Sequence, residues 1–564
     1  MPSKGALLIL LAWFALLLGS VFCPATLCGQ QDGSSAGSVS GSFQIDTQVY
    51  FEDSVIGTPL VDEVVRTNGY GQITYTKGDF AAGLRYEAYL PKPLLGIDAA
   101  YEGSGITNRF ATFTRDNFSI TVGNFYEQFG MGMILRAWWE PLLGWDTSLD
   151  GVRVVFEPTK GLRFKGLYGR QRIFYDLGRG SVRGGDVELD LASLLDTLWK
   201  SKTNITLGAS YVSKFEAGKT IPLGDYVYNV PENVGASSAR ITIQHGGFAF
   251  RSEYAYKAND PNANNGYIYR SGQALYAAVS YTQKGYGFNL EAKRLDNMDF
   301  RSDRTATGQN LVINFLPPIA RQHSLRLPTL YIYATQPNGE MGIQADAYFH
   351  FKKDTPLGGR YGTTVSVNYS RIHDIDTLPR LDVEGYRSDF LAVGKRVFYS
   401  DFNIEVQNKI SPRIKTMFSY IHIVYDRDKV LGLAGYGRIN VNAAIAEATY
   451  KLTKKYSIRV EGQWMGAQQI DDHQNTDFGD WAMLLVELNA SPHWFVSVGD
   501  EYNYGNVKLE QRAHYYSAMA GYLFGSSRIT LSYGRVRAGL NCAGGICRPV
   551  PAMNGFMLSV SSTF

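Results

Sequence analysis

The sequence contains few charged residues, four cysteines and eight histidines in 564 residues. Charged residues make up 19% of the chain, below the roughly 25% of ordinary soluble domains. The formal net charge of +3 is too small to indicate a polyanionic partner or an acidic substrate. We therefore expect no nucleic acid among the partners of this protein.

Motifs for enzyme chemistry are missing as well. The histidines are scattered, and neither HExxH, GxSxG nor a phosphate-cradling glycine loop occurs. The sequence predicts that the protein is not an enzyme and that it carries no cofactor and no metal. One segment, Asp471-Asp472-His473 with Asp477, could hold a cation, but such a segment is more typical of a solvated loop.

Long apolar runs are absent after the first thirty residues. Leu7 to Val21 is apolar and follows the positive charge of Lys4, which is typical of a secretory signal peptide. The run is short for the ~20 residues of a membrane-spanning helix. We expect a signal peptide over residues 1–29, a disordered Gln-, Gly- and Ser-rich lead-in over 30–41, and one folded unit over 42–564.

Cleavage of the signal peptide leaves two cysteines, Cys542 and Cys547. Outside the cytoplasm, a disulfide is the default expectation for such a pair. A metal site is disfavoured, because two thiolates provide only half of a zinc site. The predicted disulfide would fix the tip of one loop.

Glycine and tyrosine are abundant, with 59 and 37 residues, and apolar and polar side chains alternate in many short segments. Phe118-Ser119-Ile120-Thr121-Val122 and Ile458-Arg459-Val460-Glu461 are examples. Side chains alternate across a β-strand, so each segment has one apolar and one polar face. A soluble β-sandwich would alternate too, and the connections must decide between the two folds.

Short turns alternate with long polar stretches along the chain. Eleven short turns, such as Lys77-Gly78-Asp79, fall between long stretches. The long stretches lie near 53–69, 89–104, 127–150, 171–185, 214–236, 258–271, 296–341, 372–388, 427–439, 465–480, 503–513 and 539–552. This rhythm predicts an all-β protein: a single transmembrane antiparallel β-barrel of about 24 strands (22–26), with short periplasmic turns and long extracellular loops. A soluble all-β protein of two domains is the alternative.

The C-terminal strand carries the sharpest signal. Phe556, Leu558 and Val560 alternate with polar or flexible residues, and the chain stops on Phe564. This pattern resembles the signal that the bacterial outer-membrane assembly machinery recognises. We expect the protein to lie in the cell outer membrane, with the lipid bilayer and that machinery as partners.

Three segments resemble one known family. They are Gly123-Asn124-Phe125-Tyr126-Glu127-Gln128-Phe129-Gly130 through Leu135-Arg136, then Leu149-Asp150-Gly151-Val152-Arg153, and Tyr333-Ala334-Thr335-Gln336-Pro337-Asn338-Gly339-Glu340. They look like parts of a large, uncharacterised outer-membrane β-barrel family of Bacteroidota. The resemblance implies a fold and a location, but no activity and no site residues.

Two loops look unsuited to solvent. The first contains Arg136, Trp138, Trp139 and Glu140 in an apolar, glycine-containing body; it predicts either a constriction inside the lumen or a long strand pair with an aromatic tip. The second, 296–341, contains Arg321, Arg326 and Glu340, which could select solutes by charge or could belong to a solvated loop.

The sequence leaves three functions open. A barrel this wide needs a filled lumen, and the short lead-in leaves no room for an N-terminal plug domain. We expect a porin-like channel for small solutes. The alternative is a non-enzymatic accessory barrel of an envelope transport or protein-secretion complex with periplasmic or outer-membrane partner proteins, and a receptor or enzyme is third.

Overall fold

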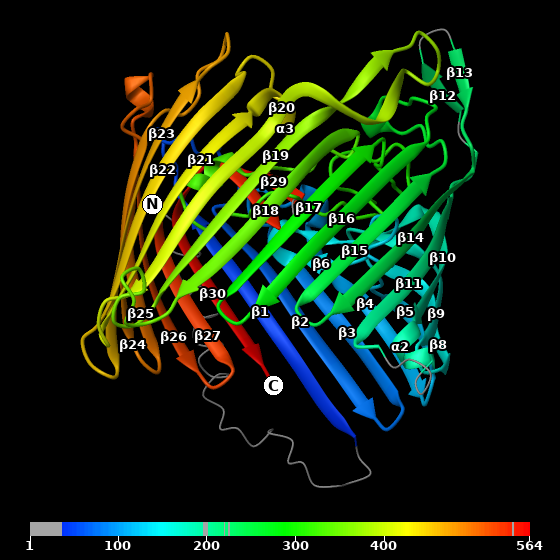
Figure 1. Ribbon diagram of the computed structural model, residues 1–564, viewed down its shortest axis with the longest axis horizontal. Helices are drawn as coiled ribbons and strands as arrows, with labels where there is room; N and C mark the ends of the chain where they lie inside the picture. The colour runs from blue at the N-terminus through cyan, green and yellow to red at the C-terminus, as the bar shows by residue number, and fades with distance from the viewer. Residues whose placement is uncertain (1–36, 196–200, 219, 224–225, 544–545) are drawn as a thin grey trace.

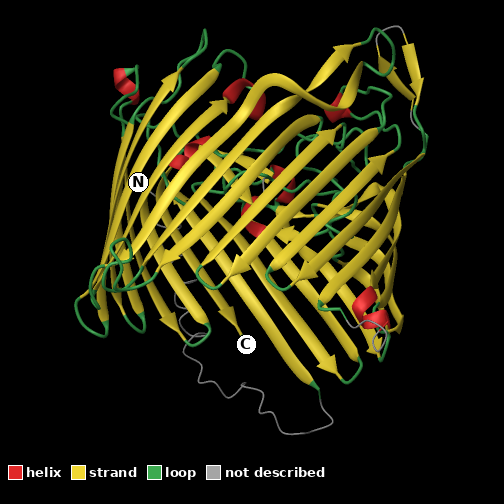
Figure 2. Ribbon diagram, viewed as in Figure 1, coloured by secondary structure: helices red, strands yellow, loops and turns green. Residues whose placement is uncertain are grey.

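A computed structural model describes residues 37–195, 201–218, 220–223, 226–543 and 546–564. Most of these residues belong to one antiparallel sheet of 24 strands, which closes on itself where β1 pairs with β30 (Figures 1 and 2). The predicted fold class and strand number are therefore confirmed. The predicted signal peptide, 1–29, lies outside the described residues.

The barrel strands follow one another around the wall in chain order. They are β1 (Ser38–Tyr50), β2 (Val65–Lys77), β3 (Phe80–Leu90), β4 (Gly103–Arg115), β5 (Phe118–Phe125), β8 (Leu149–Thr159), β9 (Leu162–Ile173), β10 (Asp176–Asp190), β11 (Thr203–Phe215), β14 (Asn233–His245), β15 (Phe248–Lys257), β16 (Gly272–Gln283), β17 (Tyr286–Asp296), β18 (Gly339–Phe351), β19 (Thr363–Pro379), β20 (Tyr386–Lys409), β21 (Ile414–Asp426), β22 (Arg438–Lys451), β23 (Tyr456–Gln469), β24 (Trp481–Ala490), β25 (Trp494–Tyr502), β26 (His514–Phe524), β27 (Ser527–Val536) and β30 (Met553–Thr563).

Small elements lie in the connections. Three two-stranded hairpins are β6 (Trp139–Glu140) with β7 (Trp145–Asp146), β12 (Thr220–Leu223) with β13 (Tyr226–Asn229), and β28 (Gly539–Ala543) with β29 (Ile546–Val550). Short helical turns are η1 (Ala99–Tyr101), η2 (Pro141–Leu143), α2 (Leu191–Leu195), η4 (Ala263–Asn265), η5 (Pro328–Tyr331), α3 (Arg427–Leu431) and η6 (Leu509–Gln511). Within the described residues, no helix is both long and apolar enough to cross a bilayer.

The alternation in the sequence becomes an outer apolar face and an inner polar face. In β30, Phe556 and Leu558 share one face with Ile45 of β1, whereas Ser559 shares the other face with Asp46. Closure pairs the backbone groups of the sheet internally, which hydrocarbon requires because it offers no hydrogen-bond partners. A closed antiparallel sheet with this outer face is an outer-membrane barrel.

The two rims differ as predicted. The short turns lie on one rim together with the start of β1 and the end of β30, at the bottom of Figure 1. The opposite rim carries the long connections. By the usual orientation of such barrels, the short-turn rim is periplasmic and the long-loop rim is extracellular.

Three predicted boundaries are wrong. The stretch 171–185 is strand apart from a tight turn between Ile173 and Asp176, and the stretch 372–388 is strand apart from residues 380–385. Polar residues there indicated loops, but strands continue beyond the membrane, where water solvates such side chains. The first strand starts at Ser38, inside the expected lead-in.

The main hydrophobic core lies inside the barrel. Residues of the connections β5–β8 and β17–β18, such as Phe129, Ile134 and Ile319, are buried together with inward-facing wall residues such as Ile421 and Val441. A large part of the apolar packing of this protein therefore fills the lumen, in addition to the apolar surface that contacts lipid.

Candidate functional site

Two long connections fold into the barrel. We call residues 126–148 the first inner loop, residues 297–338 the second inner loop, and both together the internal plug. Each loop bonds to side chains on the inner face of the wall, as described below. The lumen and this plug form the candidate functional site.

The first inner loop is anchored by a buried network of two arginines and two carboxylates. Arg85 and Glu87 lie two apart on the inner face of β3, with 2.8 Å between Nε and Oε1. Arg172 of β9 bonds Glu87 through Nη2 at 2.7 Å and Asp146 through Nη1 at 2.6 Å. Asp146, in the inner loop, also pairs with Arg85. The four side chains are only 1–3% exposed.

Three further contacts hold the start of this loop. Glu127 binds Lys165 at 2.8 Å and Arg153 at 2.5 Å, both on the wall. The backbone N–H of Met131 donates to Glu253 of β15 at 2.7 Å. The first inner loop is thus attached to the wall from β3 to β15.

The first half of the second inner loop reaches back to β9 and to Glu216, the residue that follows β11. The Ser302 hydroxyl donates to Gln171 Oε1 at 2.7 Å, and Arg304 Nε binds Glu216 at 3.0 Å. Arg304 and Glu216 are almost fully buried. This half of the loop is therefore fastened as firmly as the first inner loop.

The second half crosses to the opposite side of the wall. Arg321 binds Asn403 and Glu405 of β20 at 2.5 and 3.1 Å, and His323 Nε2 lies 2.6 Å from Asp401. Arg326 binds Glu501 of β25 at 3.0 Å. The second loop alone therefore spans from β9 to β25.

The two inner loops also bind each other. The Arg136 N–H donates to the Ile313 carbonyl and the Phe315 N–H donates to the Gly132 carbonyl, both at 2.9 Å. The Arg136 guanidinium lies over the rings of Trp138 and Phe315, at 4.6 and 4.0 Å. No ion pair to Arg136 is found among the described residues, and partial burial lowers the pKa of its guanidinium.

Of the other predicted residues of the first loop, Trp139 packs against side chains of the wall and Glu140 lies in a hairpin of the loop itself. Trp139 lies 4.1 Å from the Arg85 guanidinium and 5.7 Å from the Tyr70 ring. Glu140 is paired with Trp145 in the β6–β7 hairpin. The alternative of a long strand pair with an aromatic tip is wrong, because residues 126–148 form a loop whose apolar side chains are buried against the inner wall.

Glu340 does not line a pore, contrary to the prediction. Its side chain is fully buried and binds Lys293 at 2.6 Å. It also accepts hydrogen bonds from the Tyr333 hydroxyl and the Gln336 N–H, at 2.5 and 2.7 Å. Burial raises the pKa of Tyr333 well above its ordinary value. Glu340 thus fastens the end of the second inner loop where it joins β18.

Sequence reasoning missed the anchoring network on Arg85, Glu87, Asp146 and Arg172. The one local signal is Arg85 and Glu87, opposite charges two apart in a strand and therefore on one face. Their partners are 61 and 85 residues away, which no local pattern reveals.

Two carboxylates of the acidic segment in the β23–β24 connection are bound by arginines. Asp471 binds Arg438 at 2.8 Å, and this bond lowers the pKa of the Asp471 carboxyl. Asp477 is turned inward, where it pairs with Arg427 and Tyr331. No cluster of three or more His, Cys, Asp or Glu that could hold a metal occurs in the described part of the chain.

The two cysteines are joined in the β28–β29 hairpin. Cys542 and Cys547 are direct register partners with a Cα–Cα distance of 4.1 Å. Beyond the disulfide, the Arg548 guanidinium donates to the Gly96 carbonyl. The hairpin also lies next to η2 and η5, so it contacts both inner loops.

The proposed assembly residues lie at the seam of the barrel. Phe556 and Phe564 are exposed on the lipid-facing side, with Leu558 and Val560 on the same face. The backbone of Phe564 exchanges two 2.9 Å hydrogen bonds with Gly41. The last residue therefore closes the ladder between the first and last strands.

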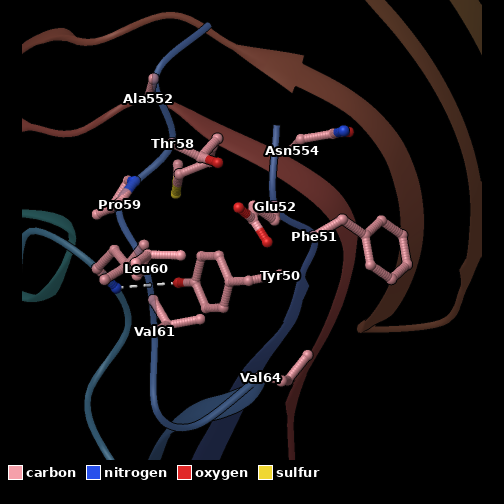
Figure 3. A pocket seen from close by; sticks show the side chains of 12 residues that line it. Tyr50, Phe51, Glu52, Thr58, Pro59, Leu60, Val61, Val64, Ala552 and Asn554 are labelled. Carbon is pink, nitrogen blue, oxygen red and sulfur yellow. Dashed lines mark hydrogen bonds between the residues drawn. The ribbon is translucent and has the colours of Figure 1, made fainter. Parts of the chain in front are cut away.

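A small pocket lies at the extracellular rim beside this seam (Figure 3). It has a volume of about 180 Å³ and lies between the β1–β2 connection and the start of β30. The Tyr50 hydroxyl accepts a hydrogen bond from the Leu95 N–H at 3.0 Å, and Pro59, Leu60 and Val61 line the opening.

A family profile matches residues 4–564, almost the whole chain. The chain belongs to DUF6029, a family of unknown function. This agrees with the expected membership of an uncharacterised family, while the phylum Bacteroidota stays a prediction. No curated protein matches the sequence.

Many solved structures share the barrel architecture at low similarity. They include the siderophore receptor PirA from Pseudomonas aeruginosa (9% identity, 94% of this chain, 81% of that chain, TM-score 0.37). A mutant of the ferric enterobactin receptor PfeA from the same organism, in complex with enterobactin, is 10% identical over 95% of this chain and 82% of that chain, with a TM-score of 0.43. OccAB3 from Acinetobacter baumannii is 9% identical over 93% of this chain and 99% of that chain, with a TM-score of 0.36. We draw no functional argument from these similarities.

Proposed function

We propose that this outer-membrane barrel is a non-enzymatic, gated channel for small solutes, with the internal plug as its gate. The observation that carries the proposal is the second inner loop, which spans the lumen from β9 to β25. A barrel of 24 strands encloses a wide lumen unless something fills it. Here the chain's own loops provide the filling.

The charged side chains of the plug would set which solutes pass. Arg136, with Trp138 beside it, is a cation without an ion-pair partner in the described structure. Arg321 and Arg326 are partly exposed. We propose that these three arginines line the path when the gate opens, while Trp139 and Glu140 position the first inner loop.

The test is planar-bilayer conductance of the purified full chain and of a plug deletion. Asp296 and Gly339 are register partners, so a tight turn can replace residues 298–337 without moving the strands. We expect rare openings from the native protein and stable, large steps from the deletion variant. A folded deletion variant without current would contradict the channel.

The matched control removes a loop of the same rim that is no part of the plug. The hairpin β12–β13, residues 220–229, is suited to this purpose. Its deletion should leave conductance unchanged. Heat-modifiable mobility in gels reports whether each variant forms a closed barrel.

An accessory role in an envelope transport or protein-secretion complex is the second candidate. The rim pocket of Figure 3 favours it, because Leu60 is 83% exposed beside that pocket. This role would be favoured if neither the native protein nor the plug deletion conducted ions. A partner protein that co-purifies with the native chain and is lost on Leu60→Ser substitution would complete that evidence.

We propose in addition that Phe564, with Phe556, Leu558 and Val560, is recognised by the outer-membrane assembly machinery. A Phe564→Ser variant should reach the surface at reduced levels. Normal levels would show that the terminal residue is not part of the signal.

A further inference from the structure

A second pocket lies on the outside of the barrel, where β19 and β20 leave the wall. After a register shift at His373, the two strands continue as a ribbon, residues 374–393, that leans across the extracellular rim (Figure 1). Tyr386 and Ser388 of this ribbon each bind Asp296 at the end of β17, at 2.6 Å. Phe390 packs against Tyr254 of β15, with 6.3 Å between ring centroids.

The space between the ribbon and the wall is a groove of about 270 Å³. We call it the outer groove. Its wall side is formed by outward-facing residues of β16, β17 and β18, and its other side by the ribbon. The apolar lining residues are Leu275, Ala277, Ala292, Met341, Ile343, Phe390, Leu391 and Val393.

One end of the outer groove is basic. Arg294 and Arg371 line it, and no carboxylate does so among the residues that the structure describes. Arg371 is exposed on β19 and its Nε donates to His373 Nε2 at 2.9 Å. His373 Nδ1 lies 3.1 Å from the Gly394 carbonyl, so both ring nitrogens of His373 already have a partner. Lys293 also borders the groove, but its buried ammonium binds Glu340 at 2.6 Å, so the two arginines are the cations left to meet an anion there.

Arg294 is buried but incompletely bonded. It is 2% exposed, its guanidinium lies 4.8 Å from the Phe390 ring, and Nη2 binds Asp296 and Ser388, both at 3.2 Å. Nε and Nη1 have no hydrogen-bond partner in the described part of the chain. Buried donors without an acceptor are costly, so an anion entering the groove would gain binding energy here.

The groove faces lipid near the extracellular interface. Arg294 lies two residues before the end of β17, at the long-loop end, and outward neighbours such as Leu290 and Ile343 are exposed on the lipid side. Phosphate suits a guanidinium because it accepts two parallel N–H bonds. Pockets that enclose a whole drug-sized ligand measure about 300–1,000 Å³. The groove, at about 270 Å³, is smaller, so its apolar part suits one acyl chain of a lipid.

We propose that the outer groove binds a phosphorylated lipid of the outer leaflet, with its phosphate on Arg371 and Arg294 and one acyl chain along Ala277, Ala292 and Ile343. This site is independent of the channel, because it lies on the opposite face of the wall. Its occupant would hold the β19–β20 ribbon against the barrel.

Native mass spectrometry of the detergent-purified full chain with bis-phosphorylated lipid A tests the site. We expect a one-to-one adduct. Arg371→Gln should weaken binding about tenfold, the loss of one charge-assisted hydrogen bond. Ala292→Phe should weaken it at least as much by filling the apolar part.

Matched controls are Arg183→Gln and Ala446→Phe, which change outward residues on β10 and β22 away from the groove. Both should bind lipid A as the native protein does. The proposal would be overturned if dephosphorylated lipid A bound the native protein as tightly as lipid A does. It would also be overturned if both groove variants bound lipid A as tightly as the native protein. Full displacement of lipid A by millimolar inorganic phosphate would overturn the acyl-chain contact and show an anion site alone.

Discussion

The two ends of the internal plug are fastened in different ways. Asp146, at the end of the first inner loop, joins a network whose side chains are 1–3% exposed. Arg321 and Arg326, in the second half of the second loop, belong to ion pairs in which the arginines are 34% and 44% exposed. Water competes little with the first set and strongly with the second.

This difference indicates which part of the plug can move. Breaking the buried network would leave charges without partners inside the protein, whereas the exposed pairs can exchange for water at small cost. We infer a fixed half, anchored on β3, β9 and the end of β11, and a more easily released half. In that second half, the buried contacts of His323 with Asp401 and of Tyr331 with Asp477 must break together with the exposed pairs to β20 and β25. Substitutions in each half test this difference.

The largest effect is expected from Asp146→Asn. This change leaves Arg85 and Arg172 without one of their carboxylates, which costs about 3–5 kcal/mol in comparable buried pairs. The folded barrel should unfold at lower denaturant, and the first inner loop should become open to protease. Asp62→Asn, at an exposed pair with Lys92, is the control and should change neither.

Gly130→Ala should have an intermediate effect. Gly130 has a φ of +52°, and an added Cβ would lie 2.3 Å from Glu253 Oε2, which accepts the Met131 N–H. Left-handed strain costs roughly 1–2 kcal/mol, and displacing Glu253 adds to it. Gly266→Ala carries similar strain, at a φ of +66° with open space around it. If both variants lose equal stability, Glu253 is not an anchor.

The smallest effect on stability is expected from Arg321→Gln. At an exposed pair the loss is at most about 1 kcal/mol, which corresponds to an increase of up to about fivefold in channel open probability. The difference from the native protein should shrink at high salt, because salt screens exposed charges. Arg380→Gln, outside the lumen, is the control. Unchanged gating with loss of global stability would place Arg321 in the fixed half.

Much of the fold could be predicted from the sequence, because a strand that faces lipid and water must alternate. Segments such as Phe118–Val122 therefore indicated strands, and the eleven short turns between long stretches indicated a barrel of about 24 of them. The two wrong loops, at 171–185 and 372–388, have strands that extend into water, where alternation no longer separates lipid from solvent.

The candidate site was only partly predictable. Arg136, Trp138, Arg321 and Arg326 stood out because they occur in loops with unusual composition. The anchors Arg85, Glu87 and Arg172 did not, since a polar inner-face residue looks the same whether it contacts water or a loop. Their pairing depends on barrel closure, which brings β3 and β9 to the same inner loop.

The most direct test of a releasable plug is to tie its moving half to the wall. His323 and Asp401 are in contact at 2.6 Å, so a His323→Cys, Asp401→Cys variant can be bridged by a short bis-maleimide, while Cys542 and Cys547 are already joined. Single-channel recordings before and after bridging then compare the free and tied plug. The account predicts openings that stop when the bridge forms. Openings of unchanged size and frequency after complete bridging would contradict it.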